Sequence, residues 1–88
     1  MEFEWDPEKA TSNEDKHGVS FEDAMLVFTD RNAITFADPD HSLTEMRDIT
    51  IGRSGDWLIL TVSHTERSGR IRIISARKAT KSEAKLYE

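Results

Sequence analysis

The 88-residue sequence contains no cysteine, which excludes the disulfide framework that small domains from oxidising compartments often need. It has no apolar run that approaches the ~20 residues of a membrane span. Its first residues also lack the basic and then apolar layout of a signal peptide. We therefore expect a cytoplasmic protein that has no membrane partner and is not exported by that route.

Several common site motifs are also absent. The sequence has no GxxxxGK[ST], GxGxxG or GxSxG motif, so nucleoside-triphosphate, dinucleotide and serine-hydrolase sites lose their usual support. It has no cysteine and histidine set for zinc, and the spacing of Asp38, Asp40 and His41 matches no calcium loop. We interpret residues 38–42 as a polar loop and expect neither a metal nor an organic cofactor.

The length and hydrophobic content fit one domain, residues 1–88, with a small core. Leucine, isoleucine, valine and phenylalanine make up 19 of the 88 residues. The net charge of -5 conceals an asymmetry, because residues 1–48 carry 13 acids and 4 bases whereas residues 49–88 carry 4 acids and 8 bases. The later half is thus predicted to offer a basic face to phosphate, and two differently charged solvated faces are the alternative.

Capping residues predict two helices near the start of the chain. Asp6 before a proline and Gly18 delimit a helix over about 7–17. Ser20 caps a second helix over about 21–29, whose apolar residues follow the spacing of one buried stripe. The two helices are expected to pack as one unit because only a tight corner separates them.

From Asn32 onward the hydrophobic period becomes two, which predicts strands. Glycine turns at 54–56 and 67–69 indicate that consecutive strands are antiparallel. Residues 1–5 alternate like an edge strand, and a capping box predicts a short last helix over about 81–87. The sequence therefore predicts an α+β fold with two N-terminal helices on a mostly antiparallel sheet of four to five strands.

Strand parity places polar residues at the ends of apolar rows. His64 is in phase with the apolar residues before it in its strand. Glu45 and Arg47 are in phase with Ile49 and Ile51. Arg77 is in phase with Ile71 and Ile73. We expect these four polar residues to form a pocket at a sheet margin, since a charge at the end of a buried row needs a partner or a cleft. Arg72 has the opposite parity and would join the pocket only if the strand is bulged.

This cluster holds groups that can move protons and bind phosphate. His64 with Glu45 is a candidate acid–base pair, and a structural histidine is the alternative. The basic C-terminal run is a candidate phosphate site, with solvated strand faces as the alternative. The run comprises Arg67, Arg70, Arg72, Arg77, Lys78, Lys81 and Lys85.

The sequence resembles the BrnT toxin family over nearly its whole length. The most specific segments are FEWDP at 3–7, KHGVSFE at 16–22 and IRIISAR at 71–77. Single residues that add to the resemblance are Asn13, Ala24, Phe28, Asp30, Glu45, Arg47, Ile51, Gly52, His64, Thr65, Arg67, Ala79, Glu83 and Tyr87.

The resemblance implies the toxin of a type II toxin–antitoxin system with a RelE-like fold. Such a toxin is a metal-independent endoribonuclease that cuts RNA and inhibits translation. A BrnA-type antitoxin with a ribbon-helix-helix domain neutralises it in a hetero-oligomer, and the complex binds operator DNA only through that antitoxin.

We assign roles to this sequence by combining the resemblance with the chemistry of metal-free RNA cleavage. Proton transfer falls to His64 or Glu45, and phosphate and transition-state binding to Arg67, Arg72 and Arg77. Arg47 is expected to orient Glu45, and Arg47, Arg70 and Lys78 to contact RNA.

Two other functions stay open at this point. The same basic strands would serve a binding module without catalysis, and a toxin of this fold that poisons DNA gyrase would leave RNA intact. The acidic net charge weakens the binding of free RNA, so a substrate met on the ribosome is one way to supply positioning.

Overall fold

The computed structural model of the chain describes residues 1–40, 46–55 and 58–88. Its elements, in chain order, are β1 (Glu2–Glu4), α1 (Pro7–His17), α2 (Phe21–Leu26), the 3₁₀ helix η1 (Val27–Thr29), β2 (Ile34–Ala37), β3 (Arg47–Ser54), β4 (Leu58–Arg67), β5 (Arg70–Lys78) and α3 (Lys81–Tyr87). This order confirms the predicted α+β fold. None of the helices in the described ranges combines the length and apolar character that crossing a bilayer requires.

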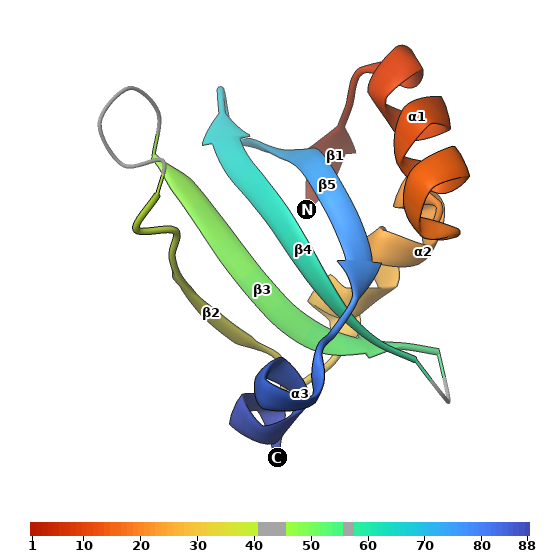
Figure 1. Cartoon of the computed structure of the whole chain (residues 1–88). Coiled ribbons are helices and arrows are strands. Elements are labelled where there is room, and N and C mark those ends of the chain that lie inside the picture. Colours follow the sequence, from red (N-terminus) through yellow and green to blue (C-terminus); the bar gives the residue numbers. More distant parts are fainter. Residues whose placement is uncertain (41–45, 56–57) are drawn as a thin grey trace.

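The five strands form one sheet in the order β1-β5-β4-β3-β2 (Figure 1). The four strands from β2 to β5 pair antiparallel, as predicted, and β4 lies at the centre. The predicted edge strand is confirmed as β1, which pairs parallel with β5 so that Glu2–Glu4 face Arg70–Arg72. The start of the chain is therefore a direct neighbour of the last strand.

The predicted helix caps are present. Asp6 accepts a hydrogen bond from an N–H in the first turn of α1 at 2.9 Å, and Gly18 ends the helix with a φ of 71°. The second helix was predicted over about 21–29, which is one turn too long. Val27–Thr29 form a 3₁₀ helix instead, in which the Thr29 hydroxyl donates to a carbonyl three residues earlier at 2.7 Å.

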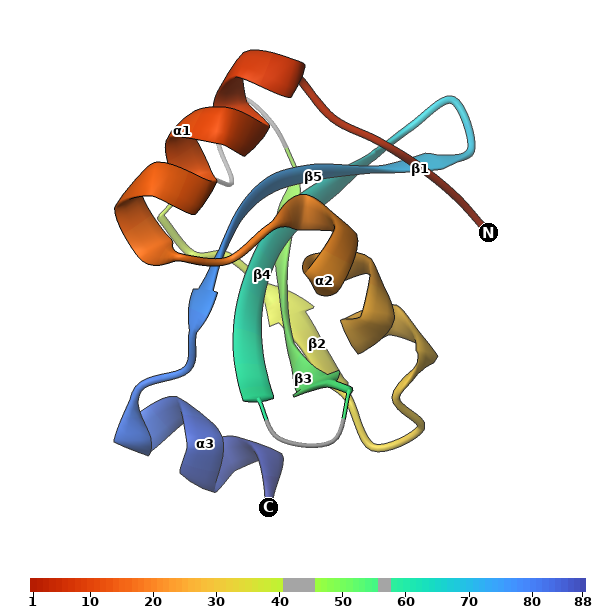
Figure 2. The same cartoon turned by 90° about the vertical axis from the view of Figure 1, so that its right-hand side faces the viewer.

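The pleat of the strands gives the sheet two faces. α1 and α2 cover one of them, which we call the helix face (Figure 2). The buried core of this face comprises Leu60, Val62, Ile73 and Ala76 from the strands and Val19, Phe21, Ala24 and Val27 from the helical segments. The other face, which we call the open face, receives α3 at one end, where α3 packs against β3.

Asn13 joins α1 to the edge of β5. Its side-chain N–H groups donate to the Ala76 carbonyl at 2.8 Å and to the Val19 carbonyl at 3.0 Å, and its Oδ1 accepts from the Ala76 N–H at 3.1 Å. The amide thus pairs with the β5 backbone as a neighbouring strand would. It satisfies buried polar groups beyond the point where β1 stops pairing.

Gly52 allows the chain to fold tightly over β3. A Cβ at this position would lie 2.8 Å from Val27 Cγ1 and 2.9 Å from Ala33 Cβ. The η1 segment can therefore pack directly on the β3 backbone only because residue 52 has no side chain.

A β-bulge in β5 reverses one of the predicted strand parities. Ser63 pairs with Ser75, but the next residue, His64, pairs with Ile73, so Ile74 is the extra residue. The prediction that Arg77 shares a face with Ile73 is therefore wrong, because the bulge moves Arg77 to the open face.

Candidate functional site

The open face carries arginines in rows that run across the strands. Arg47 on β3, Thr65 on β4 and Arg72 on β5 pair in one row, and Glu4 on β1 extends it. Paired residues on neighbouring strands point to the same face, so these side chains are neighbours. The bulge is the reason that Arg72 belongs to this row.

A second row on the open face contains Arg77, which pairs with Thr61. Thr61 and Thr65 are four residues apart on β4, so the two rows are separated by ~13 Å along the strand. Between them lie two short hydroxyl side chains, Ser63 and Ser75, which pair with each other. The open face thus has a floor of small polar residues with one arginine row on each side of it.

Glu83 on α3 holds Arg77. The guanidinium donates to both oxygens of the Glu83 carboxylate, at 2.7 and 2.9 Å. Glu83 also accepts hydrogen bonds from the Thr61 hydroxyl at 3.0 Å and the Thr80 N–H at 2.9 Å. Arg77 is the main reason that the pKa of Glu83 falls from 4.5 to about 2, and Glu83 in turn raises the pKa of Arg77. This two-point contact attaches α3 to the open face.

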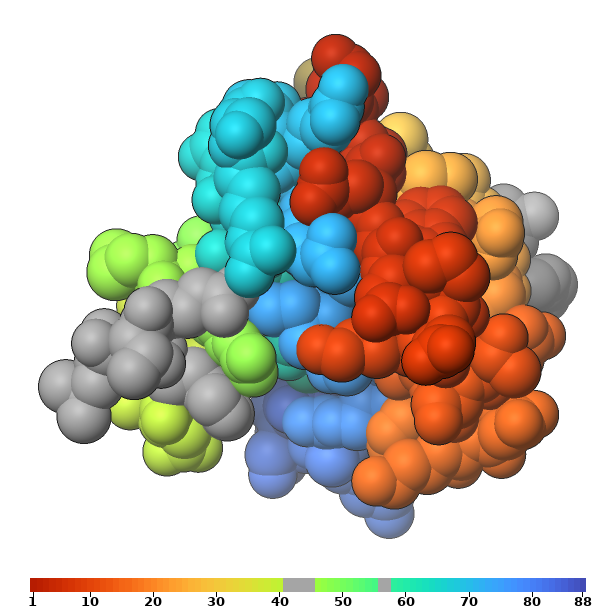
Figure 3. Space-filling model, turned by 90° about the horizontal axis from the view of Figure 1, so that it is seen from above, coloured from red at the N-terminus to blue at the C-terminus, as the bar shows by residue number. Residues whose placement is uncertain are grey.

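The acidic strand β1 lies against the other arginines. Glu4 accepts a hydrogen bond from Arg72 at 2.9 Å and lies 3.8 Å from Arg70, which is 3.5 Å from Glu2. Seen from above, the β4–β5 turn in cyan lies beside the first residues of the chain in dark red (Figure 3). The basic half of the sequence therefore does not form an unmixed basic face, because β1 brings carboxylates to it.

Three further predicted site residues, the phosphate-binding Arg67 and the RNA contacts Arg70 and Lys78, lie at different places. Arg67 and Arg70 pair across the β4–β5 turn, whose central residues Ser68 and Gly69 both have positive φ. Lys78 pairs with Leu60 and is exposed on the helix face. The turn arginines thus continue the open face, whereas Lys78 does not belong to it.

His64 lies on the helix face, as its parity with Leu60 and Val62 predicts. It is 7% exposed, its Nε2 is 2.7 Å from the Thr50 hydroxyl, and its ring packs edge-on against Phe28 with centroids 4.9 Å apart. Burial lowers the pKa of His64, and the nearby Asp48 carboxylate opposes this shift. The imidazole is therefore neutral at pH 7.

The predicted polar pocket is not formed as a single cluster. His64 lies on the helix face, whereas Arg47 and Arg77 lie on the open face, so the prediction that they converge is wrong. Arg47 does share a face with Ile49 and Ile51, as its parity predicts, but this face is the one opposite His64. Glu45, the fourth member, lies outside the described residues, as does His41.

Sequence reasoning missed the two carboxylates that organise the arginines, Glu4 and Glu83. The sequence does contain a signal for Glu4. In residues 2–4 two acids flank an apolar residue, and in residues 70–72 two arginines flank an apolar residue in the same pattern. It becomes informative only once the parallel pairing of β1 and β5 is known. Among the described residues, no three histidine or acidic side chains are close enough together to hold a metal ion.

Comparisons with known proteins identify the family. The sequence model of the ribonuclease toxin BrnT of type II toxin–antitoxin systems matches residues 5–83. The chain belongs to the BrnT family. Its structure is also similar to the 1.1 Å crystal structure of the Brucella abortus ribonuclease toxin BrnT, with a TM-score of 0.73 and 25% sequence identity, over 92% of this chain and 99% of that one. No curated protein matches the sequence.

Membership of the BrnT family confirms the resemblance seen in the sequence. The chain is a ribonuclease toxin of a type II toxin–antitoxin system, and this class implies a cognate antitoxin as partner. The similarity to the Brucella toxin confirms the arrangement of N-terminal helices, five-stranded sheet and short C-terminal helix.

Proposed function

We propose that the chain is a metal-independent endoribonuclease that binds RNA on the open face and inhibits translation by cutting it. The observation that carries this proposal is the pair of arginine rows, with Arg47 and Arg72 in one row and Arg77 in the other. RNA is a chain of phosphates, and planar guanidinium groups are suited to two-point contacts with phosphate oxygens.

Metal-free cleavage asks for three kinds of group. A base takes the proton of the ribose 2′-hydroxyl, an acid protonates the leaving 5′-oxygen, and cations stabilise the charge on the phosphorane. The arginines of the open face supply the cations. Arg72 donates one hydrogen bond to Glu4, and a guanidinium has five N–H donors, so the same side chain can also bind phosphate.

The proton-transfer roles of His64 and Glu45 stay predictions. Burial of His64 between Thr50 and Phe28 supports its structural alternative, because a general base must come within hydrogen-bond reach of the proton that it takes. The pH–rate profile of His64→Gln separates the two roles. A structural histidine changes activity only in proportion to the folded fraction, whereas a general base changes the profile of fully folded enzyme.

We further propose that residues 1–88 act as one toxin domain in the cytoplasm and that a BrnA-type antitoxin neutralises it. In this proposal the antitoxin provides the contacts with operator DNA. The net charge of -5 on the toxin supports this, because an acidic protein binds DNA phosphates poorly. Restored growth on co-expression of the adjacent small gene, together with co-purification of the two proteins, tests this part.

The ribonuclease proposal is tested with purified toxin and single-stranded RNA in the presence of EDTA. Wild type should cleave, and Arg72→Ala should lower kcat/KM by about 10²-fold, in the range found when one transition-state donor is removed. Glu4→Gln is the matched control, because it breaks the same ion pair and keeps the arginine. Activity should persist in this control.

Intact RNA from folded wild-type protein would refute the proposal. A supercoiling assay with purified gyrase then distinguishes the gyrase-poisoning toxin from the binding module. Cleavage that disappears in EDTA and returns with a divalent cation would refute metal independence alone.

A further inference from the structure

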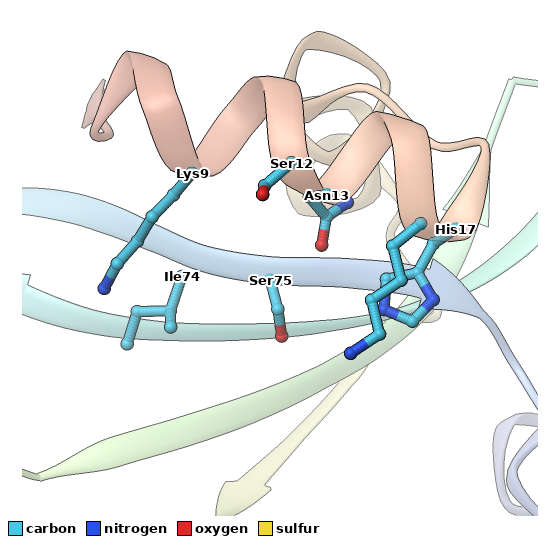
Figure 4. Close-up of a pocket in the computed structure, with 7 residues that line it drawn as sticks. Lys9, Ser12, Asn13, His17, Ile74 and Ser75 are labelled. Atoms are coloured by element: carbon cyan, nitrogen blue, oxygen red, sulfur yellow. The ribbon is translucent and has the colours of Figure 1, made fainter.

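A groove outside the arginine rows runs between α1 and the outer edge of β5. It has a volume of about 260 Å³ and is lined by Lys9, Ser12, Asn13, Lys16, His17, Ile74 and Ser75. Figure 4 shows Lys9, Ser12 and His17 on the side of α1 that faces Ile74 and Ser75 of β5. Ser75 also belongs to the floor of the open face, whereas the five lining residues from α1 lie outside that floor.

The lysines and the acids of α1 lie on neighbouring stripes of the helix. Lys9, Lys16 and the imidazole of His17 line the groove, while Glu8 and Asp15 line a second hollow that meets the groove at Ser12. In a helix, residues 9, 12, 13 and 16 fall on one stripe and residues 8, 11 and 15 on another, because neighbours on a face are three or four apart. The groove is therefore locally basic although α1 as a whole is not.

The groove is continuous with the open face through Ser75. This residue lies between Arg72 and Arg77 on β5 and also lines the groove. The bulge at Ile74 occurs at the same place, beyond Arg72, where β1 stops pairing with β5. A strand of RNA that crosses the floor of the open face at Ser75 would thus reach the lysines of α1 next.

We propose that this groove binds the phosphate backbone of single-stranded RNA next to the cleaved bond, with Lys9 and Lys16 as its main contacts. The inference rests on the proposed ribonuclease function and adds a substrate-binding track to it. Lys9 and Lys16 are seven residues apart, or ~10 Å along the helix axis, so the pair suits successive phosphates rather than a single one.

The lining of the groove favours RNA over a protein segment. Protein interfaces are anchored by buried aromatic and other large apolar side chains, and this groove has only Ile74 of that kind. Four of the other six lining side chains end in an ammonium or a hydroxyl group, and these are the groups that position a phosphate chain without reading its sequence. The groove is therefore expected to bind RNA of any sequence.

The test measures binding separately from cleavage. Single-stranded RNA that is 2′-O-methylated has no free 2′-hydroxyl, so its binding can be followed by fluorescence anisotropy without reaction. We compare wild type with Lys9→Gln/Lys16→Gln, in which glutamine keeps a high helix propensity. Lys81→Gln/Lys85→Gln is the matched control, since it removes two exposed positive charges of the basic run that the structure places on α3, outside the groove and outside both arginine rows.

The groove variant should bind about 10-fold or more weakly at low salt. Each lost phosphate contact also lowers the slope of log K against log salt by about 0.7, so the slope should fall by about 1.4. The α3 control should bind like wild type. With unmodified RNA, the groove variant should show a raised KM and a kcat close to that of wild type, because the groove binds RNA away from the reacting bond.

Wild-type affinity and salt slope in the folded groove variant would overturn the inference and would point to a protein partner for the groove. An equal loss in the α3 control would overturn it too, because the effect would then reflect net charge. Absence of cleavage by wild type, with the binding difference intact, would refute the ribonuclease proposal and leave the phosphate groove standing.

Discussion

The carboxylate of Glu83 should make the stability of this protein depend on pH below 4.5. Its pKa is about 2 in the folded state against an ordinary value of 4.5, mainly because of Arg77. At about 1.4 kcal/mol for each pKa unit, this difference is worth at most about 3.5 kcal/mol. The Arg77 side chain is 41% exposed, so solvent screens the pair and we expect about 2 kcal/mol.

The sign follows from the protonation states. Above pH 4.5, Glu83 is charged in both the folded and the unfolded chain, and the full stabilisation is present. As the pH falls from 4.5 towards 2, the unfolded chain binds the proton first and the stabilisation is lost. Glu83→Gln should therefore lower the free energy of unfolding by about 2 kcal/mol at pH 7, or the melting temperature by about 10 °C. More than half of this difference should be gone at pH 3.

Urea denaturation of wild type and Glu83→Gln at pH 7, 5, 4 and 3 measures this difference. Glu14→Gln, at an exposed position in α1, is the control and should change the free energy of unfolding little at any of these pH values. A destabilisation by Glu83→Gln that stays constant from pH 7 to pH 3 would refute the electrostatic reasoning. The helix cap formed with Thr80 would then explain the whole effect.

Three further changes test the framework that positions the site. Asn13→Ala should lower the free energy of unfolding, measured by thermal or urea denaturation, by about 2–4 kcal/mol, because it leaves buried backbone groups of Ala76 unpaired. A decrease of less than about 0.5 kcal/mol would contradict this role of Asn13. Gly52→Ala should cost about 1–3 kcal/mol, because its methyl group would meet Val27, and wild-type stability would show that η1 moves away easily. The free energy of unfolding of wild type should fall as the pH drops below 6.5, because burial lowers the pKa of His64 in the folded state. His64→Gln should lack this part of the pH dependence. Parallel curves of stability against pH for the two proteins would contradict this prediction.

Most of the fold was predictable from local signals. The caps at Asp6, Gly18 and Ser20 and the turn at 67–69 depend only on residues a few positions apart. The parallel pairing of β1 with β5 was not predictable in this way, since it joins opposite ends of the chain. The 3₁₀ turn at Val27–Thr29 was missed because the hydrophobic spacing continues through it.

The candidate site was harder to predict because it depends on one inserted residue. Arg72 and Arg77 are five positions apart, so a regular strand would place them on opposite faces. The bulge at Ile74 changes this count and puts both on the open face. Nothing in the local sequence marks Ile74 as the extra residue. The opposite placement of His64 and Arg47 likewise follows from the pairing of β3 with β4, which parity within one strand does not contain.

The acidic net charge and an RNA substrate are compatible because the charges are segregated in space. Glu8 and Asp15 lie on a neighbouring stripe of α1 and line a separate hollow that shares only Ser12 with the groove, so the groove itself is lined by Lys9 and Lys16 without a carboxylate. Salt screens the repulsion between RNA and exposed carboxylates that lie more than about 10 Å away. The electrostatic potential at the binding surface is therefore set mainly by the cations next to it. Glu4 is different, because it lies within the arginine row itself. It should therefore compete with phosphate for Arg72, and Glu4→Gln should strengthen RNA binding, whereas Glu14→Gln, at an exposed position of α1 outside the groove, should have little effect.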